Sequence, residues 1–381
     1  MLLSALEKLE GGAAPQNVDD LDEAMLTVME AEKEIADEVD AVEEMDEVVE
    51  EAEEALTRLE GIRDAITEYG ISKPMMLAAD PNRELVAGGV IGDYEDLDTV
   101  PVKDSDASAA IESIGETIKN VWKKLADFFK NLWTKIKNLF AALTRGFKSQ
   151  ETIVVNLIKQ YKDANLDEKK FKEITVNAIP KKRLEELAKN FDNSMGKLEE
   201  LGKLGLSLVN LIDGEKTDVD KVEKDVAKFI SELKSQQNAL KSLGIDIKVD
   251  EKTKSIVVTT KDVKLEKEKK KMNALGWGST SDIEKGLKAS YVVITAGKVA
   301  DKTGEVINKT LSAFSKKLEG EIKHVADMDP AEVRSIQKVV NQVKGVINAA
   351  RKISQHVMMS GSTIASSMST VGKAGLKAKA D

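Results

Sequence analysis

The chain has 381 residues, of which 41% are apolar and 33% are charged, a composition typical of a folded helical protein. It contains no cysteine and only two histidines, His324 and His356, which excludes disulfides, cysteine nucleophiles and thiolate metal sites and argues against a histidine metal cluster. Because it also lacks a phosphate-binding loop, a dinucleotide fingerprint and a nucleophile elbow, we predict no enzymatic activity, no catalytic residues, no metal site and no cofactor.

The net charge of −10 is the sum of two unlike parts. Residues 1–112 contain 32 Asp and Glu against 7 Lys and Arg, a balance of −25, whereas residues 113–381 have a balance of +15. This division predicts an acidic arm and a basic body with different partners. Neither a signal peptide nor a transmembrane segment is recognisable, so we expect synthesis in the cytoplasm.

The acidic N-terminal arm covers residues 1–70. Within it, apolar residues at alternating spacings of three and four predict a long coiled-coil or bundle helix over residues 18–69, where 21 side chains are acidic and 3 are basic. The flanks of such a helix repel one another, so we expect it to be stable only against a basic or apolar partner. Formation of oligomers through this helix is one way to meet that need. An acidic linker rich in proline and glycine follows over residues 71–112.

Residues 113–147 predict a cationic, aromatic amphipathic helix that Gly146 ends. Its apolar face, a candidate for contact with a membrane or a partner, consists of Ile118, Trp122, Leu125, Phe129, Leu132, Trp133, Ile136 and Phe140. Its cationic face consists of Lys119, Lys123, Lys124, Lys130, Lys135, Lys137 and Arg145. Two interpretations stay open at this point. The apolar face is either part of a core, as helical stripes usually are, or the buried side of a helix lying at a membrane surface.

The remainder of the chain is also predicted to be helical, apart from one hairpin. Alternation of β-branched residues predicts strands at 245–249 and 256–260 in a β-hairpin over residues 245–265. A capping box at Ser281 and Glu284 predicts one helix start, and Asp329 before Pro330 predicts another. The predicted segments are a helical region over 148–244 (helices at 151–163, 167–190, 194–212 and 218–243), long C-terminal helices over 266–359 (281–326 and 330–358) and a flexible tail over 360–381.

The predicted fold class is therefore mainly α: a long acidic N-terminal helix, a linker and an elongated helical body with one small β-hairpin. The body's cations are almost all lysines, and its arginines are Arg145, Arg183, Arg334 and Arg351. Lysine neutralises phosphate without reading bases, so non-specific, salt-sensitive binding of DNA is favoured over sequence recognition. The alternative is that these charges only keep a helical surface soluble.

This layout resembles the internal head proteins of phiKZ-like jumbo bacteriophages. The residues that carry the resemblance are the acidic arm, the linker, the stretch IKNVWKKLADFFKNLWTKIKNLF at 118–140 and the lysine-rich helical body. The resemblance implies a structural virion protein that is made as a precursor and packaged in the capsid with the genome. It also implies trimming by a prohead protease and departure from the head with the DNA.

The same resemblance implies a cleavage pattern, because the prohead proteases of that group cut after small-x-Glu, where the small residue is Ser, Ala or Gly. Ala110, Ile111 and Glu112, followed by Ser113, fit this pattern at the charge boundary. Cleavage there would release the −25 segment and leave the +15 body. The pattern is short, and it also occurs at Ala5-Leu6-Glu7, Ala36-Asp37-Glu38, Ala41-Val42-Glu43 and Ala52-Glu53-Glu54.

Three functions are consistent with the sequence. The first is an internal head protein whose partners are other virion proteins, packaged DNA and the prohead protease. The second is a membrane-active protein that acts on an anionic membrane surface through residues 113–147. The third is a helical scaffold or adaptor that is never processed.

Overall fold

The computed structural model describes residue 30 and residues 104–212, 218–250, 256–263, 269–298, 300–324 and 330–378. The predicted acidic helix and most of the predicted linker lie outside these residues, apart from Glu30, which is helical and exposed. In the described part the protein is mainly α with small antiparallel sheets, which confirms the predicted fold class.

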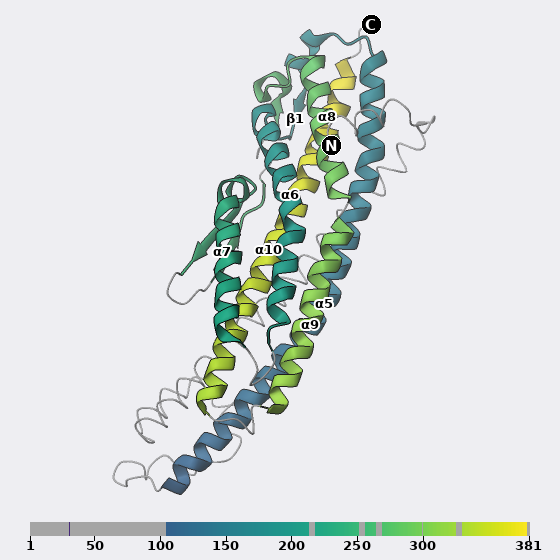
Figure 1. The fold of residues 1–381 in the computed structure, drawn as a ribbon. Coiled ribbons are helices and arrows are strands. Elements are labelled where there is room, and N and C mark those ends of the chain that lie inside the picture. Colours follow the sequence, from purple (N-terminus) through teal and green to yellow (C-terminus); the bar gives the residue numbers. More distant parts are fainter. Residues whose placement is uncertain are drawn as a thin grey trace, which may run out of the picture.

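Long helices running along one axis make up an elongated bundle (Figure 1). The longest, at 60 residues, extends for about 90 Å at ~1.5 Å per residue. The helices are α5 (Asp104–Asp163), α6 (Lys181–Val209), α7 (Val219–Ser242), α8 (Thr280–Gly297), α9 (Ala300–His324) and α10 (Pro330–Gly375). The 3-10 turns are η2 (Glu168–Lys172), η4 (Met272–Leu275) and η6 (Leu376–Ala378).

Helix α10 forms the centre of the bundle and packs against α5, α6, α7 and α8 (Figure 1). Its side chains at Val343, Ile347, Ile353, Val357 and Ile364 are at most 1% exposed. These residues join the apolar side chains of the surrounding helices in one continuous core. A single core of this length explains why the body is a rod and not a row of separate small domains.

The hairpin forms where the sequence predicted it. Strands β2 (Ile245–Val249) and β3 (Ile256–Thr260) pair antiparallel, with Ile245 opposite Thr260. Gly244 precedes the hairpin with φ +88°, and a side chain there would collide with the carbonyl group of Lys261. A second, smaller sheet of β1 (Thr175–Val176) and β4 (Lys270–Lys271) was not predicted.

The predicted flexible tail over 360–381 is wrong for residues 360–378, because α10 continues to Gly375 and η6 follows to Ala378. The glycines of this stretch lie where neighbouring side chains approach closely: a Cβ at Gly372 would lie 2.9 Å from Leu157. Polar groups are also matched, since Ser367 accepts a hydrogen bond of 2.8 Å from the backbone N–H of Ile179. Small residues, which are typical of a frayed tail, here permit close helix packing.

Helix α5 is longer than predicted at both ends. It begins at Asp104, so the last nine residues of the predicted linker are helical, and it passes through Gly146 without a break. A glycine inside a helix costs about 1 kcal/mol. The neighbouring Leu143 and Phe147 are both at most 1% exposed, and their burial offsets that cost.

Other boundaries also differ from the prediction. The helix predicted over 281–326 is divided into α8, which ends at Gly297, and α9, which begins at Ala300. The cap of α8 is Ser279 and not the predicted Ser281 box, because the Ser279 hydroxyl accepts a hydrogen bond of 3.1 Å from the backbone N–H of Asp282. The Asp282 carboxylate in turn accepts hydrogen bonds from Ser279 at 2.7 Å and from Lys181 at 2.6 Å.

The two helices predicted over 167–190 and 194–212 are likewise wrong. Residues 168–176 contain η2 and β1, and α6 is continuous from Lys181 to Val209. Pro180 disfavours helical backbone at the preceding residue, so α6 begins directly after it.

Candidate functional site

The phenylalanines of α5 fit against glycines on the helices opposite. A Cβ at Gly304 of α9 would lie 2.7 Å from Phe140, and a Cβ at Gly297 of α8 would lie 2.5 Å from the ring of Phe147. The two glycines are seven residues apart, as are the two phenylalanines. One contact lies at the end of α8 and the other near the start of α9, and in each a phenylalanine of α5 packs against bare backbone.

Polar and aromatic contacts extend this interface in both directions. Phe129 of α5 packs edge-on against Phe314 of α9, with ring centroids 5.1 Å apart. At the other end Lys298 donates hydrogen bonds of 2.9 and 2.8 Å to the two carboxylate oxygens of Glu151. Helix α5 is thus held to α8 and α9 from Phe129 to Glu151.

The predicted apolar face of α5 is part of the core wherever its side chains are described. Phe129, Leu132, Ile136 and Phe140 are at most 1% exposed. The side chains of the other four members, Ile118, Trp122, Leu125 and Trp133, lie outside the described part of the chain. Of these four, Phe129 packs on Phe314 and Phe140 packs on Gly304, both on α9 of the same chain. One signal in the sequence could have indicated this packing. Gly297 and Gly304 are seven residues apart, the same spacing as Phe140 and Phe147.

Most of the predicted cationic face is on the surface. Lys123, Lys130, Lys137 and Arg145 are exposed and Lys135 is half-buried, whereas the side chains of Lys119 and Lys124 are outside the described part. The first three lie at seven-residue intervals on α5 and form a row along one side of the helix. A second row on α9 has the same interval and consists of Lys302, Lys309 and Lys316, all exposed.

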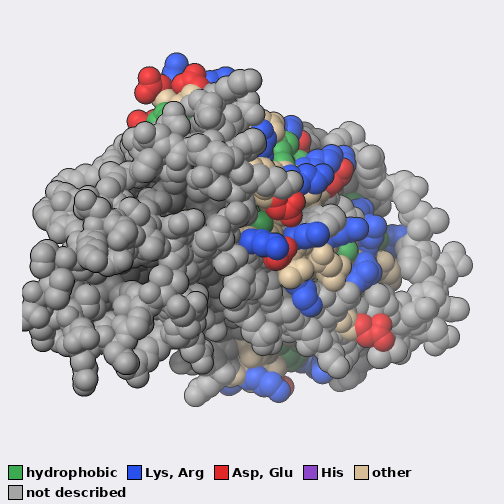
Figure 2. Space-filling view, turned by 90° about the horizontal axis from the view of Figure 1, so that it is seen from below, with side chains coloured by type: hydrophobic (Ala, Val, Ile, Leu, Met, Phe, Trp, Pro, Cys, Tyr) green, Lys and Arg blue, Asp and Glu red, His purple; other side chains and the backbone are tan. Residues whose placement is uncertain are grey.

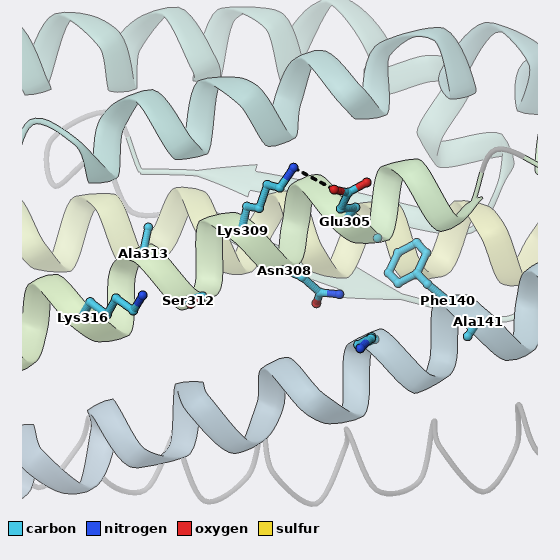
Figure 3. A pocket seen from close by; sticks show the side chains of 10 residues that line it. Phe140, Ala141, Glu305, Asn308, Lys309, Ser312, Ala313 and Lys316 are labelled. Carbon is cyan, nitrogen blue, oxygen red and sulfur yellow. Dashed lines mark ion pairs between the residues drawn. The ribbon is translucent and has the colours of Figure 1, made fainter.

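A groove of about 630 Å³ lies between α5 and α9 (Figure 3). The half-buried Ala141 and Ala313 supply its apolar surface above the buried Phe140, and lysines from both rows lie at its edge. Asn308 points from α9 into the space between the two helices and is 9% exposed. Its amide oxygen has no hydrogen-bond donor among the described groups. The complete lining is Lys137, Phe140, Ala141, Gly304, Glu305, Asn308, Lys309, Ser312, Ala313 and Lys316.

The groove carries a net positive charge. Its single carboxylate, Glu305, forms an ion pair of 2.8 Å with Lys309, and the hydrogen bond from Lys309 lowers the pKa of that carboxyl. Within the described part of the chain, Lys137 and Lys316 have no acidic partner. Figure 2, seen from below, shows Lys and Arg side chains close together among the described residues, with a few Asp and Glu between them. Such a surface attracts polyanions.

The sequence matches the family of phiKZ-like phage internal head proteins over residues 18–380. The chain belongs to this family. The match covers nearly the whole sequence and confirms the resemblance that the layout indicated, so this is a structural protein of the phage head interior. Neither the curated proteins nor the solved structures that were compared gave a match.

In this internal head protein the candidate cleavage motif lies inside a helix and not in the linker where it was expected. Ala110, Ile111, Glu112 and Ser113 all belong to the first turns of α5, which begins at Asp104. A protease needs an extended substrate, so the start of α5 must open before the bond after Glu112 is accessible.

The sequence contains one further match, which was not recognised above. Ser149, Gln150 and Glu151 fit small-x-Glu in the C-terminal part of α5, and they are the one match after residue 113. The Gln150 side chain is 2% exposed and accepts a hydrogen bond of 2.8 Å from Ser369, while Glu151 is paired with Lys298. These contacts keep the second match inaccessible to a protease while the bundle is folded.

Of the two histidines, His356 is packed inside the bundle. His356 is 5% exposed, and its Nε2–H donates to the carbonyl oxygen of Lys261 at 3.0 Å. Burial lowers the pKa of this imidazole. The side chain of His324 lies outside the described part. Across the described residues there is neither a cluster of potential metal ligands nor a helix that is long and apolar enough to cross a membrane.

Proposed function

We propose that this internal head protein is made as a precursor whose acidic segment, residues 1–112, is removed after Glu112. The lysine-rich bundle that remains binds packaged DNA through its phosphates. The observation that carries the proposal is that the charge changes sign where the motif lies, with −25 before Ser113 and +15 after it.

The distribution of motifs supports trimming that spares the bundle. Five small-x-Glu matches occur within residues 1–112, and the single later match is at Glu151. Because Gln150 is buried and Glu151 is paired, cleavage there would require the packed interior of the bundle to open. Opening the first turns of α5 costs less, since helix ends open more readily than packed interiors.

The composition of the bundle's surface is evidence for a partner that binds through its charge. Val257 is the one large apolar side chain that is exposed in the described part, so the apolar surface of these helices is used internally. The lysine row on α5 places one cation about every 10.5 Å along the helix. Lysines spread in this way neutralise phosphates without reading bases, which suits a protein packed against any part of a genome.

The N-terminus of the protein in mature phage particles tests this proposal. We expect mass spectrometry to find a chain that begins at Ser113, and a phage encoding Glu112→Gln to retain the longer form. Glu151→Gln is the matched control, because it removes the buried motif and should leave the N-terminus unchanged. A protein that still begins at Met1 in mature particles contradicts the proposal and favours an unprocessed scaffold.

A further inference from the structure

We propose that, before processing, the groove between α5 and α9 is the docking site of the acidic segment 18–69 of the same chain. This inference rests on the proposed function and adds where the acidic segment binds. The groove in this sense consists of the lining residues given above, with Lys137 and Lys316 at its edge.

Charge complementarity is the first argument for this occupant. Residues 18–69 carry 21 acidic and 3 basic side chains, which repel one another in an isolated helix. The groove offers Lys137 and Lys316, neither of which has an acidic partner in the described part of the chain. Docking therefore relieves repulsion on the segment and supplies counter-charges to the groove.

The two surfaces also have matching periodicities. Apolar residues of the segment, such as Leu21, Met25 and Val28, follow spacings of three and four and form a stripe along a helix. The groove presents apolar surface at the half-buried Ala141 and Ala313, with lysine rows at seven-residue intervals on each helix beside it. An acidic coiled-coil helix laid between the rows would place its stripe on the apolar surface and its carboxylates toward the lysines.

The chain is long enough for the segment to reach the groove. Residues 70–103 join the segment to α5, and 34 residues span at most about 110–120 Å when extended. Lys137 lies 33 residues into α5, about 50 Å from its start. Tethering also keeps the local concentration of the segment high, so weak contacts suffice for docking.

A photo-crosslinking experiment on the full-length chain tests the docking. Because the protein has no cysteine, Ala313→Cys gives a single attachment point in the groove for a benzophenone label. Lys228→Cys is the control, on the exposed side of α7, which packs on α6 and α10. We expect light to link the label at position 313 to residues 18–69 of the same chain, and the label at position 228 not to react there.

Charge reversal separates specific docking from chance proximity. We expect Lys137→Glu with Lys316→Glu to lower the yield of that crosslink roughly tenfold, because two attractive charges become repulsive. The matched variant, Lys224→Glu with Lys241→Glu on α7, changes the net charge equally and should leave the yield unchanged. Circular dichroism confirms that each variant is folded before the yields are compared.

Three results would overturn the docking proposal. They are an absence of crosslinks to residues 18–69, crosslinks found only between isotopically distinct chains, and a label at position 313 that reacts with added duplex DNA in place of the segment. The proposed function fails by a different measurement, the N-terminus in mature particles. Docking in the precursor and removal in the particle are therefore tested separately.

Discussion

Burial disfavours the charged form of His356. The imidazole is enclosed between α10 and the residue that follows β3, and burial lowers its pKa, although the hydrogen bond to Lys261 and the nearby Asp262 act in the opposite direction. A histidine that is neutral in the folded state and protonated in the unfolded state destabilises the fold as pH falls below 6.5, its ordinary pKa. At higher pH both states are neutral and the effect disappears.

We therefore predict that the free energy of unfolding decreases between pH 7.5 and pH 5.5, and that His356→Gln reduces this decrease. The contribution of one histidine is at most about 1.4 kcal/mol per pH unit. Urea denaturation of both proteins at the two pH values measures the difference, and carboxylates common to both proteins cancel. Identical pH dependence in the two proteins would show that His356 titrates alike in both states.

At the scale of elements, the α5–α9 pair depends on the absence of a side chain at Gly304. A Cβ there would lie 2.7 Å from Phe140, so Gly304→Ala forces the helices apart and should lower the free energy of unfolding by roughly 1–3 kcal/mol. Gly345→Ala on α10 is the control. No atom lies within 4 Å of its Cβ position, and alanine should stabilise the helix there by up to about 1 kcal/mol. Chemical denaturation followed by circular dichroism measures both, and a Gly304→Ala protein as stable as the wild type contradicts this packing.

The sequence was sufficient to predict elements whose signal is local. The hairpin at 245–260 follows from alternation and β-branching, and the start of α10 follows from Asp329 and Pro330. The C-terminal half of α10 could not be predicted in this way. Its serines and glycines are typical of a loose tail, and only the side chains opposite, such as Tyr161 and Leu157, make them a packing surface.

The candidate site likewise has features that could be predicted from local sequence and features that could not. The lysine row of α5 could be predicted from the positions of its members on the predicted helix. All three members are exposed. The groove could not be predicted, because it requires knowledge that α9 lies against α5. The burial of Phe129 and Phe140 could not be predicted for the same reason. These side chains are buried because α9 places Phe314 and Gly304 against them.

At the scale of the whole molecule, two oppositely charged parts share one chain. The described bundle encloses its apolar surface and leaves lysines outside, while the excess of acidic residues lies before residue 113. In our proposal, the acidic part docks on the basic part and keeps it from binding polyanions until it is removed. Removal of residues 1–112 would change the net charge from −10 to +15 and would shorten α5 by residues 104–112.

The affinity for duplex DNA before and after processing tests this central claim most directly. Binding of the full-length chain and of the protein recovered from mature heads would be measured by fluorescence anisotropy across a series of salt concentrations. We expect the processed protein to bind more tightly at low salt, and its affinity to fall more steeply as salt increases, because more phosphates are neutralised. Equal affinity and equal salt dependence of the two forms would contradict the account.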